Sequence, residues 1–208
     1  MAIASLSKFT VPLASDQSAS SQGMLMPKLK YRFRVMFENF GVSTPTTELT
    51  KQVSEAARPN VSFDDQTIQV YNSTIHYAGR PKWNPVTIKL RDDVTGAVSK
   101  LVGEQMQKQF DFFEQASAAS GGDYKFLMRI EMLDGGNGAQ TPNVLETWEC
   151  YGCYVVSANY NQIAYTGQEL LTIDLSIQAD NCIQTSGGAS APRARGTGTN
   201  ATGSGSRV

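Results

Sequence analysis

Few residues in this chain have the type and spacing that enzyme chemistry requires. The 208 residues include one histidine and three cysteines, which excludes a histidine-rich metal site and a dense disulfide framework. His76 lies in a segment of strand-like sequence, with no serine or cysteine nucleophile motif near it. A histidine without a predicted orienting partner is weak evidence for catalysis, so we assign His76 a structural or surface role.

The pair Cys150 and Cys153 has the C-x-x-C spacing that metal sites and thiol oxidoreductases use. Zinc requires four ligands, and a thioredoxin-type motif requires a helix N-terminus, whereas this segment has strand-like sequence. We therefore interpret Cys150 and Cys153 as a buried thiol pair. Cys182 is the remaining cysteine, and a contact between Cys182 and another chain stays open.

A glycine cluster and the carboxylates also lack a catalytic arrangement. Gly135, Gly136, Asn137 and Gly138 lead into another predicted strand, whereas phosphate-binding loops lead into a helix, so we interpret them as a hairpin turn. The carboxylates are scattered, as solvated residues and helix caps are. The sequence predicts no catalytic residue, no metal site and no cofactor, and the protein is not expected to be an enzyme.

The charge balance disfavours ordinary binding of duplex DNA. Lys and Arg total 18 and Asp and Glu total 19, which gives a net charge of -1, whereas DNA-binding domains are usually clearly basic. Charged residues make up 18% of the chain, below the usual content of about 25%. A surface with so few charges is typical of a subunit that partners partly cover.

Composition divides the chain into three regions. Residues 1–27 are rich in Ser and Ala and predict an extended N-terminal arm, and residues 28–182 form the body. Residues 183–208 form a Gly/Ser-rich tail with too little apolar surface to offset its ordering entropy. Because the arm is neutral and the tail carries three arginines, the total of -1 leaves the body at -4.

No segment of the sequence predicts contact with a membrane. No apolar run reaches the roughly 18 residues of a membrane span, and the N-terminus lacks the basic and apolar regions of a signal peptide. We therefore expect no membrane insertion by this chain and no export by a signal peptide.

Alternation of apolar and polar residues predicts that the body consists mainly of strands. In the final strand, Leu171 to Ala179 place apolar side chains on one face, so Asp174 and Asp180 make the other face acidic. The predicted strands span residues 28–37, 67–77, 86–91, 124–132, 145–154 and 171–180.

One segment has a helical period instead. The helix is predicted from about Gly96 to Ala116, with Asp92 and Asp93 near its N-terminus and Gly121-Gly122 as its stop. The resulting fold class is mainly β, an antiparallel β-sandwich or open barrel with one flanking α-helix. The apolar stripe of the helix comprises Val98, Leu101, Val102, Met106, Phe110 and Phe113.

The order of these elements resembles the tail tube proteins of contractile-tailed bacteriophages and, more distantly, the tube proteins of type VI secretion. An extended segment ends at Arg58-Pro59, a strand from Thr67 precedes a turn at Ala78-Gly79, and the next strand reaches Asp92-Asp93. The helix and a final strand over residues 172–178 follow, so the resemblance covers residues 28–182. The long arm and tail depart from the compact family pattern, which leaves open a decorated tube protein or a specialised end-of-tube subunit.

The resemblance implies a structural subunit of a virion tail, assembled in the bacterial host cytoplasm. Six copies would form a ring, and stacked rings would form a hollow conduit for DNA ejection inside a contractile sheath. The implied partners are copies of this chain, the tail sheath protein, the tape measure protein and transiting double-stranded DNA, and the baseplate and tail terminator. The alternatives are a tube protein of a type VI secretion or injection system and a monomeric β-sandwich binding module.

The same reasoning assigns three groups of candidate contact residues. An acidic lumen would avoid retaining DNA, whose affinity rises with each neutralised phosphate, and the lumen candidates are Glu149, Asp174 and Asp180. The segment over residues 42–60 is polar and is expected to have no helix, and its inter-ring candidates are Thr44, Thr47, Lys51, Arg58 and Asn60. The polar face of the helix is expected to meet the sheath through Lys100, Glu104, Lys108 and Asp111.

Overall fold

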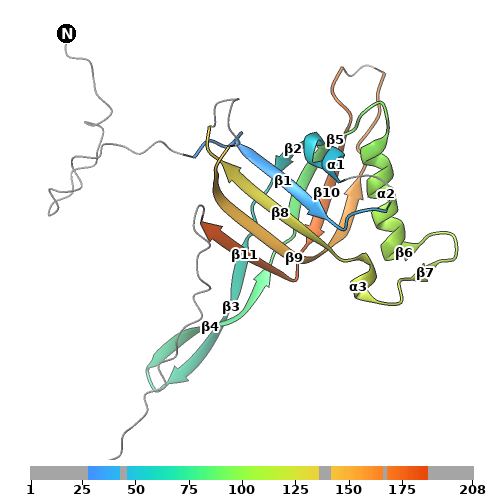
Figure 1. The fold of residues 1–208 in the computed structure, drawn as a ribbon. Helices are drawn as coiled ribbons and strands as arrows, with labels where there is room; N and C mark the ends of the chain where they lie inside the picture. Colours follow the sequence, from blue (N-terminus) through green and yellow to red (C-terminus); the bar gives the residue numbers. More distant parts are fainter. Residues whose placement is uncertain (1–27, 43–45, 136–141, 166–167, 187–208) are drawn as a thin grey trace, which may run out of the picture. The chain divides into compact units, whose positions relative to one another are not determined.

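A curved, wholly antiparallel sheet organises the chain in the computed structural model (Figure 1). The structure describes residues 28–42, 46–135, 142–165 and 168–186. The chain divides into two units, Met1–Arg32 and Phe33–Val208. In the first unit, residues 28–32 contain a turn in which the Arg32 amide donates to the Leu29 carbonyl at 3.3 Å.

The second unit contains a seven-stranded sheet in the order β1-β8-β9-β10-β5-β2, with β11 paired to β9. The end strands β1 and β2 lie near each other, so the sheet forms an open barrel. The mainly antiparallel β fold is therefore confirmed. Its strands are β1 (Phe33–Glu38), β2 (Val53–Ala56), β5 (Val86–Arg91), β8 (Phe126–Leu133), β9 (Val144–Asn159), β10 (Thr172–Gln178) and β11 (Asn181–Ser186).

The apolar side chains of the alternating strands fill the interior of the barrel. Along β5 and β10, every second side chain is buried, because successive side chains point to opposite faces of a strand. Phe40 packs between Phe37 and Phe126, with ring centroids 5.4 and 4.9 Å away. Other buried core residues include Val35, Val86, Ile88, Leu90, Leu101, Val102, Met128, Ile130, Ile173, Leu175 and Ile177.

Strand β9 is long enough to pair with both halves of the barrel. Up to Cys153 it pairs with β8 and β11, and from Tyr154 onward it pairs with β10. Gly152 has φ of 63°, a left-handed conformation that glycine adopts most readily, and it marks the change of partner. The predicted hairpin between β8 and β9 is confirmed by their antiparallel pairing, although residues 136–141 of its turn lie outside the described residues.

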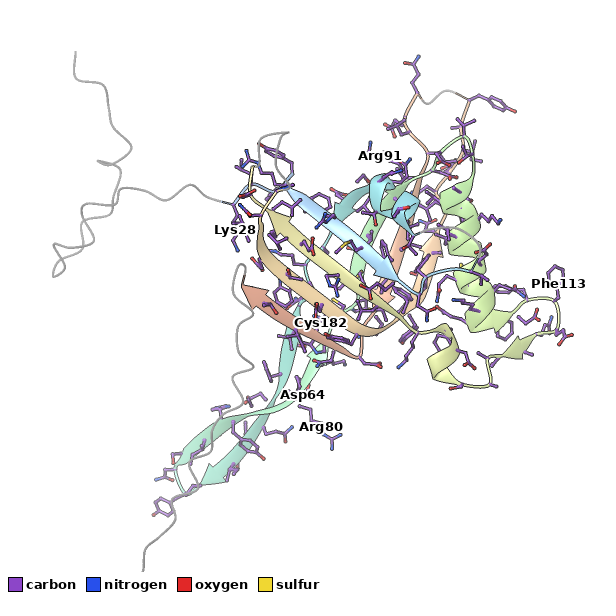
Figure 2. The ribbon with its side chains drawn as sticks, in the orientation of Figure 1. Lys28, Asp64, Arg80, Arg91, Phe113 and Cys182 are labelled. Atoms are coloured by element: carbon purple, nitrogen blue, oxygen red, sulfur yellow. The ribbon has the colours of Figure 1, made fainter. Side chains whose placement is uncertain are left out.

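The main helix is shorter than predicted. Helix α2 (Ala97–Gln109) ends seven residues before Ala116, and the short strands β6 (Phe110–Asp111) and β7 (Ala116–Ser117) follow. The Asp111 carboxylate ends the helical path, because Asp111 Oδ1 accepts the amides of Phe113 and Glu114 in a local turn. The predicted core positions Phe110 and Phe113 are therefore wrong: they are 36% and 94% exposed, and Figure 2 shows Phe113 pointing away from the barrel.

The predicted flanks of α2 have mixed outcomes. Asp93 caps the helix as expected, since Asp93 Oδ1 accepts the Ala97 amide at 3.2 Å. Gly121 and Gly122 are not a simple stop, because they begin helix α3 (Gly121–Tyr124), whose N-cap is the Ser120 hydroxyl.

Several other predicted boundaries are also wrong. Residues 28–32 lie inside the predicted first strand but outside the observed one, because β1 begins at Phe33. Residues 67–77 form no single strand but the end of a hairpin between β3 (Val61–Val70) and β4 (Ser73–Trp83). The expected turn at Ala78-Gly79 lies inside β4. The tail does not begin at residue 183, because β11 continues to Ser186.

The segment over residues 42–60 contains regular structure, contrary to expectation. Helix α1 (Thr47–Gln52) and β2 occupy most of it, and Leu49 is fully buried in the core. The helix forms because Leu49 supplies an apolar anchor for the turn, and tertiary packing rather than helix propensity stabilises so short a helix.

Candidate assembly surfaces

The β3–β4 hairpin has two chemically different faces, and Trp83 at the end of β4 packs against the core. The register pairs Ile68 with Ile75 and Gln66 with Tyr77, and Val70 lies on the same face. The opposite face carries Asp65, Thr67, Gln69, Thr74 and His76. The apolar side chains Ile68, Val70, Ile75 and Tyr77 are between 49% and 55% exposed. We call these four residues the apolar hairpin face.

The base of the hairpin is held by close backbone contacts. The Asn84 amide donates to the Asn60 carbonyl at 2.9 Å. A bulge interrupts the register between Phe63 and Asp65, and a Cβ at Gly79 would lie 2.7 Å from the Asp64 carbonyl oxygen. Glycine is therefore required at position 79 for close approach of the two strands.

The sole histidine lies on the polar face of this hairpin. His76 Nδ1 is 2.9 Å from Asp65 Oδ2, and both side chains are mostly exposed. His76 therefore lies on the surface of the hairpin, one of the two roles expected for it.

The inter-ring candidates occupy different places in the structure. Thr44 lies outside the described residues, whereas Thr47 and Lys51 are exposed on α1. The side chain of Arg58 is 61% exposed and approaches the buried Glu146 carboxylate at 3.9 Å. Asn60 is exposed at the hairpin base.

Arg58 therefore has a partner within its own chain. Glu146 Oε1 also accepts hydrogen bonds from Trp148 Nε1 at 2.6 Å and Gln184 Nε2 at 2.8 Å. These contacts connect β9 and β11 to the segment that leads into the hairpin.

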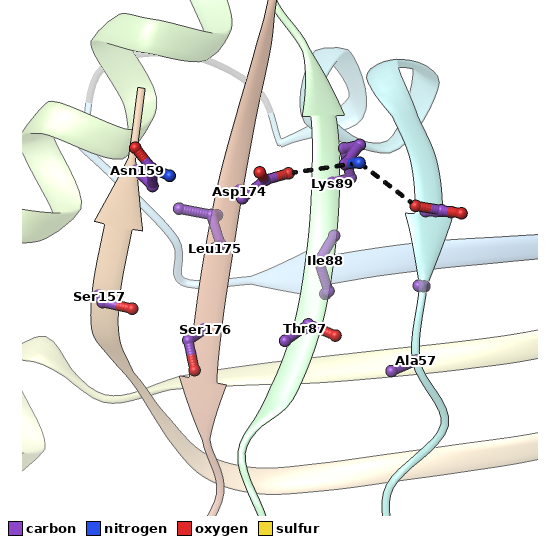
Figure 3. A pocket seen from close by; sticks show the side chains of 11 residues that line it. Ala57, Thr87, Ile88, Lys89, Ser157, Asn159, Asp174, Leu175 and Ser176 are labelled. Atoms are coloured by element: carbon purple, nitrogen blue, oxygen red, sulfur yellow. Dashed lines mark ion pairs between the residues drawn. The ribbon is translucent and has the colours of Figure 1, made fainter. Parts of the chain in front are cut away.

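A polar groove of about 590 Å³ lies on the outer face of β2, β5, β9 and β10. Lys89 Nζ lies between Glu55 Oε2 at 3.6 Å and Asp174 Oδ1 at 4.0 Å, as Figure 3 shows. Thr87, Ser157 and Ser176 line the same groove. The arrangement offers short polar side chains and one cation that two carboxylates neutralise.

The three lumen candidates do not gather at one place. Asp174 faces the groove, as its alternation with Ile173 and Leu175 predicts, and the Asn161 amide donates to it at 3.1 Å. Glu149 lies on the outer face of the β8–β9 part of the sheet, where Arg129 Nε and Tyr151 Oη donate to it.

Asp180 lies after β10 and pairs with Lys125 Nζ at 2.5 Å. This hydrogen bond raises the pKa of Lys125 above its ordinary value. All three acidic candidates therefore have hydrogen-bond donors from other parts of the fold.

The polar face of α2 is only partly free. Lys100 Nζ lies 3.8 Å from Glu104 Oε1, while Glu104 Oε2 accepts the Val42 amide at 2.8 Å. Lys108 Nζ donates to the Asn39 carbonyl at 3.4 Å. Hydrogen bonds from the Phe113 and Glu114 amides lower the pKa of Asp111. Lys100 and Lys108 thus remain the cations of this surface, whereas Glu104 and Asp111 also stabilise local turns.

Two glutamines of α2 have structural roles that the sequence did not indicate. Gln105 is fully buried, accepts the Gly41 amide at 3.1 Å and donates to the Tyr124 carbonyl at 2.6 Å. Gln109 binds both backbone groups of Val155 in β9, each at 2.9 Å. Their only sequence signal is a polar residue beside the apolar stripe of the helix.

The cysteines are arranged differently from the predicted pair. Cys150 and Cys153 are both fully buried, as expected, but Cys182 lies directly opposite Cys150 across β9 and β11. Cys182 is only 7% exposed, so its partner is within the chain rather than in another one.

Within the described ranges, no group of three potential ligand side chains is arranged to hold a metal ion. No helix in those ranges has the length and apolar character needed to cross a membrane.

The fold is shared with components of contractile injection systems. A chain of the anti-feeding prophage tube-terminating cap matches with a TM-score of 0.59 and 15% identity, over 82% of this chain and 98% of that one. A chain of the PVC sheath/tube terminator matches with a TM-score of 0.56 and 14% identity, over 79% and 100%. A chain of the PVC sheath-tube complex, an extracellular contractile injection system, matches with 0.54 and 16%, over 83% and 99%.

These structures define the class of fold, a β-barrel found in the tube and terminator assemblies of contractile systems. The predicted resemblance to tube proteins is confirmed at the level of the fold. No model of a known protein family matches the sequence, and a comparison with curated protein sequences also finds no match.

Proposed function

We propose that the chain is a structural subunit of the tube of a contractile tail, in which hexameric rings stack into a hollow conduit. The observation that carries the proposal is the apolar hairpin face, whose four side chains are half exposed within the described part of the chain. A two-stranded hairpin is marginally stable alone in water, so a second copy of the chain is the occupant that would cover it.

Covering the apolar hairpin face would favour association. Complete burial of a large aliphatic or aromatic side chain contributes about 1.5–3 kcal/mol, so covering four half-exposed side chains contributes roughly 4 kcal/mol per hairpin. In a closed ring, every subunit would bury its apolar hairpin face in the same way, so the contribution would be repeated once for each subunit. The exposed candidates Thr47, Lys51, Arg58 and Asn60 are proposed to add polar contacts between rings, together with Thr44.

The assembly test uses the purified full chain, electron microscopy and sedimentation. We expect rings or tubes from the native chain, and only a folded monomer from the double variant Ile68→Ser/Ile75→Ser. The matched control Thr67→Ala/Thr74→Ala changes the polar hairpin face and should assemble normally. A native chain that stays monomeric at high concentration with an initiating complex present would refute the tube and favour a monomeric binding module.

The same experiment distinguishes positions within a tail. A main tube subunit should form long tubes, whereas an end-of-tube subunit should form single rings. The proposed partners are those that a tube subunit would meet in a contractile tail. They are copies of the chain, a surrounding sheath protein, a baseplate and a terminator at the ends of the tube, and a tape measure protein inside it. Double-stranded DNA would be the cargo in a phage virion, and the tube of a type VI secretion or injection system is the alternative.

We also propose that the polar groove face lines the lumen. Its one lysine is neutralised by Glu55 and Asp174, so the face would not retain a polyanion through uncompensated cations. Glu149 and Asp180 are proposed for the same lining, each already beside a cation.

Selective labelling tests the lumen assignment, with the native chain as the control for reaction of its own three buried cysteines. In assembled tubes, Ser176→Cys should react with a small maleimide but resist one attached to a protein too large to enter. Lys100→Cys on α2 is the exterior control and should react with both. Equal labelling of the two variants by the large reagent would place the groove outside.

The outer face of α2 is proposed to meet the sheath through Lys100, Glu104, Lys108 and Asp111. Lys100→Glu/Lys108→Glu should leave tubes intact and weaken binding of the sheath protein of the same system. The difference in binding between the variant and the native chain should shrink in added salt, which screens the charges. Normal sheath binding by this variant would exclude the face.

A further inference from the structure

Three thiols lie on the paired strands β9 and β11. Cys182 is the register partner of Cys150 in an antiparallel pair. Opposite Cα atoms in such a pair are about 4.5–5.5 Å apart, and a disulfide accepts about 4.4–6.8 Å. The backbone therefore already meets the requirement for a bond between these two cysteines.

We propose that Cys150 and Cys182 are a site of reversible oxidation, at which a small disulfide compound converts the two thiols into a bond joining β9 to β11. This inference uses only the contacts of two neighbouring strands. It is therefore independent of tube assembly.

The two thiols are in contact and differ in reactivity. A hydrogen bond from the Cys150 thiol lowers the pKa of Cys182, while the same contact and burial raise the pKa of Cys150. Cys182 is 7% exposed, whereas Cys150 is fully buried. Since the thiolate is the attacking species, Cys182 is the first thiol to react.

The chemistry is a balanced thiol–disulfide exchange. The Cys182 thiolate attacks one sulfur of the small disulfide, which forms a mixed disulfide and releases one small thiolate. Cys150 then loses its proton and attacks the Cys182 sulfur, and the second small thiolate leaves. The protein thus loses two hydrogens, and the small disulfide becomes two thiols after protonation.

Cys153 supplies an internal comparison. It lies on the same strand as Cys150, its register partner is Phe126, and its thiol donates to the Cys150 carbonyl at 3.2 Å. Burial raises the pKa of Cys153 to about 12, which disfavours its thiolate. Position and protonation therefore both favour Cys182 as the partner of Cys150.

The bond would fasten an edge strand. Among the described strands, β11 pairs only with β9, and it leads directly into residues 187–208. A cross-link restricts the unfolded chain most when it closes a long loop, and disulfides persist in oxidising surroundings. Oxidation would therefore secure β11 once the protein leaves a reducing cytoplasm.

The test treats the native full chain with oxidised glutathione, alkylates the remaining thiols and maps the peptides by mass spectrometry. We expect one free thiol per chain in place of three, a Cys150–Cys182 cross-link, and a Tm about 5–15 °C higher that dithiothreitol reverses. Cys153→Ser should oxidise normally, while Cys182→Ser should form no intramolecular bond.

Three results would overturn the proposal. These are three free thiols after prolonged oxidation, a Cys150–Cys153 bond, and disulfide-linked dimers through Cys182. If Cys182→Ser fails to fold, the alkylation rates of the native chain decide instead. Cys182 must then be modified at least several-fold faster than Cys150 and Cys153.

Discussion

Replacing Gly152 with alanine should destabilise the protein more than a single added methyl group suggests. Gly152 has φ of 63° at the point where β9 changes partners. A Cβ there would lie 2.2 Å from Asp180 Oδ2 and 2.8 Å from Asp180 Cγ. The Asp180 side chain cannot move freely, because it pairs with Lys125 Nζ at 2.5 Å.

The magnitude follows from these two effects. A left-handed conformation costs a non-glycine residue about 1–2 kcal/mol. Relieving the contact requires Asp180 to rotate and to give up a partly exposed ion pair worth up to about 1 kcal/mol, with some strain in addition. We expect Gly152→Ala to lower the free energy of unfolding by about 2–4 kcal/mol, and Tm by roughly 5–15 °C.

Gly103→Ala is the matched control, with the opposite sign. Nothing lies within 4 Å of the position that its Cβ would occupy, and Gly103 lies inside α2. Alanine is favoured over glycine in a helix by about 1 kcal/mol, so this variant should be slightly more stable than the native chain.

Urea unfolding followed by circular dichroism measures both variants. Adding Asp180→Ala to Gly152→Ala should recover only part of the loss, because the backbone cost remains. If Gly152→Ala unfolds at the native urea concentration, β9 does not adopt the left-handed conformation at this bend and the reasoning is wrong.

Three further predictions concern α2 and the loop after it. Gln109→Glu removes the donor to the Val155 carbonyl, so we expect a loss of about 1–3 kcal/mol in urea unfolding. Gln105→Leu leaves the Gly41 amide and the Tyr124 carbonyl without their partner, and a similar loss is expected; a stability equal to the native value would contradict either role. The lowered pKa of Asp111 stabilises the fold above the ordinary aspartate pKa, and this contribution is lost as the pH falls through the lowered value. Asp111→Asn should therefore flatten the acid limb of a Tm-against-pH curve, and an unchanged limb would exclude this contribution.

The sequence predicts the strands that bury one face in the barrel. Alternation identifies β5 to the residue and β10 to within two residues, because the core imposes a period of two on both strands. The end of α2 was missed because Phe110 and Phe113 continue the helical spacing by coincidence, while the turn around Asp111 depends on side-chain hydrogen bonds.

The candidate surfaces were predicted less completely than the core. Alternation correctly directs Asp174 away from the interior, but its cation Lys89 comes from a strand more than eighty residues earlier. Likewise, Cys182 meets Cys150 only because β11 returns along β9. Pairs between residues so far apart cannot be predicted from local sequence. The ion-pair partner of an acidic residue is therefore unknown until the pairing of the strands is known.

The β3–β4 hairpin has the sequence pattern of a single strand over residues 67–77. Its turn contains Tyr71, with φ of 53°, rather than the glycine that usually marks a tight turn, so two strands resembled one. Yet Ile68 and Ile75 alternate with polar residues as regularly as strands that cover a core do. Such alternation stabilises a strand mainly where one face is buried, and within the described residues this face stays half exposed. If the proposed function is correct, the surface that covers the apolar hairpin face belongs to another copy of the chain. The alternation of apolar and polar residues in β3 and β4 then corresponds to the burial of the hairpin in the assembled tube.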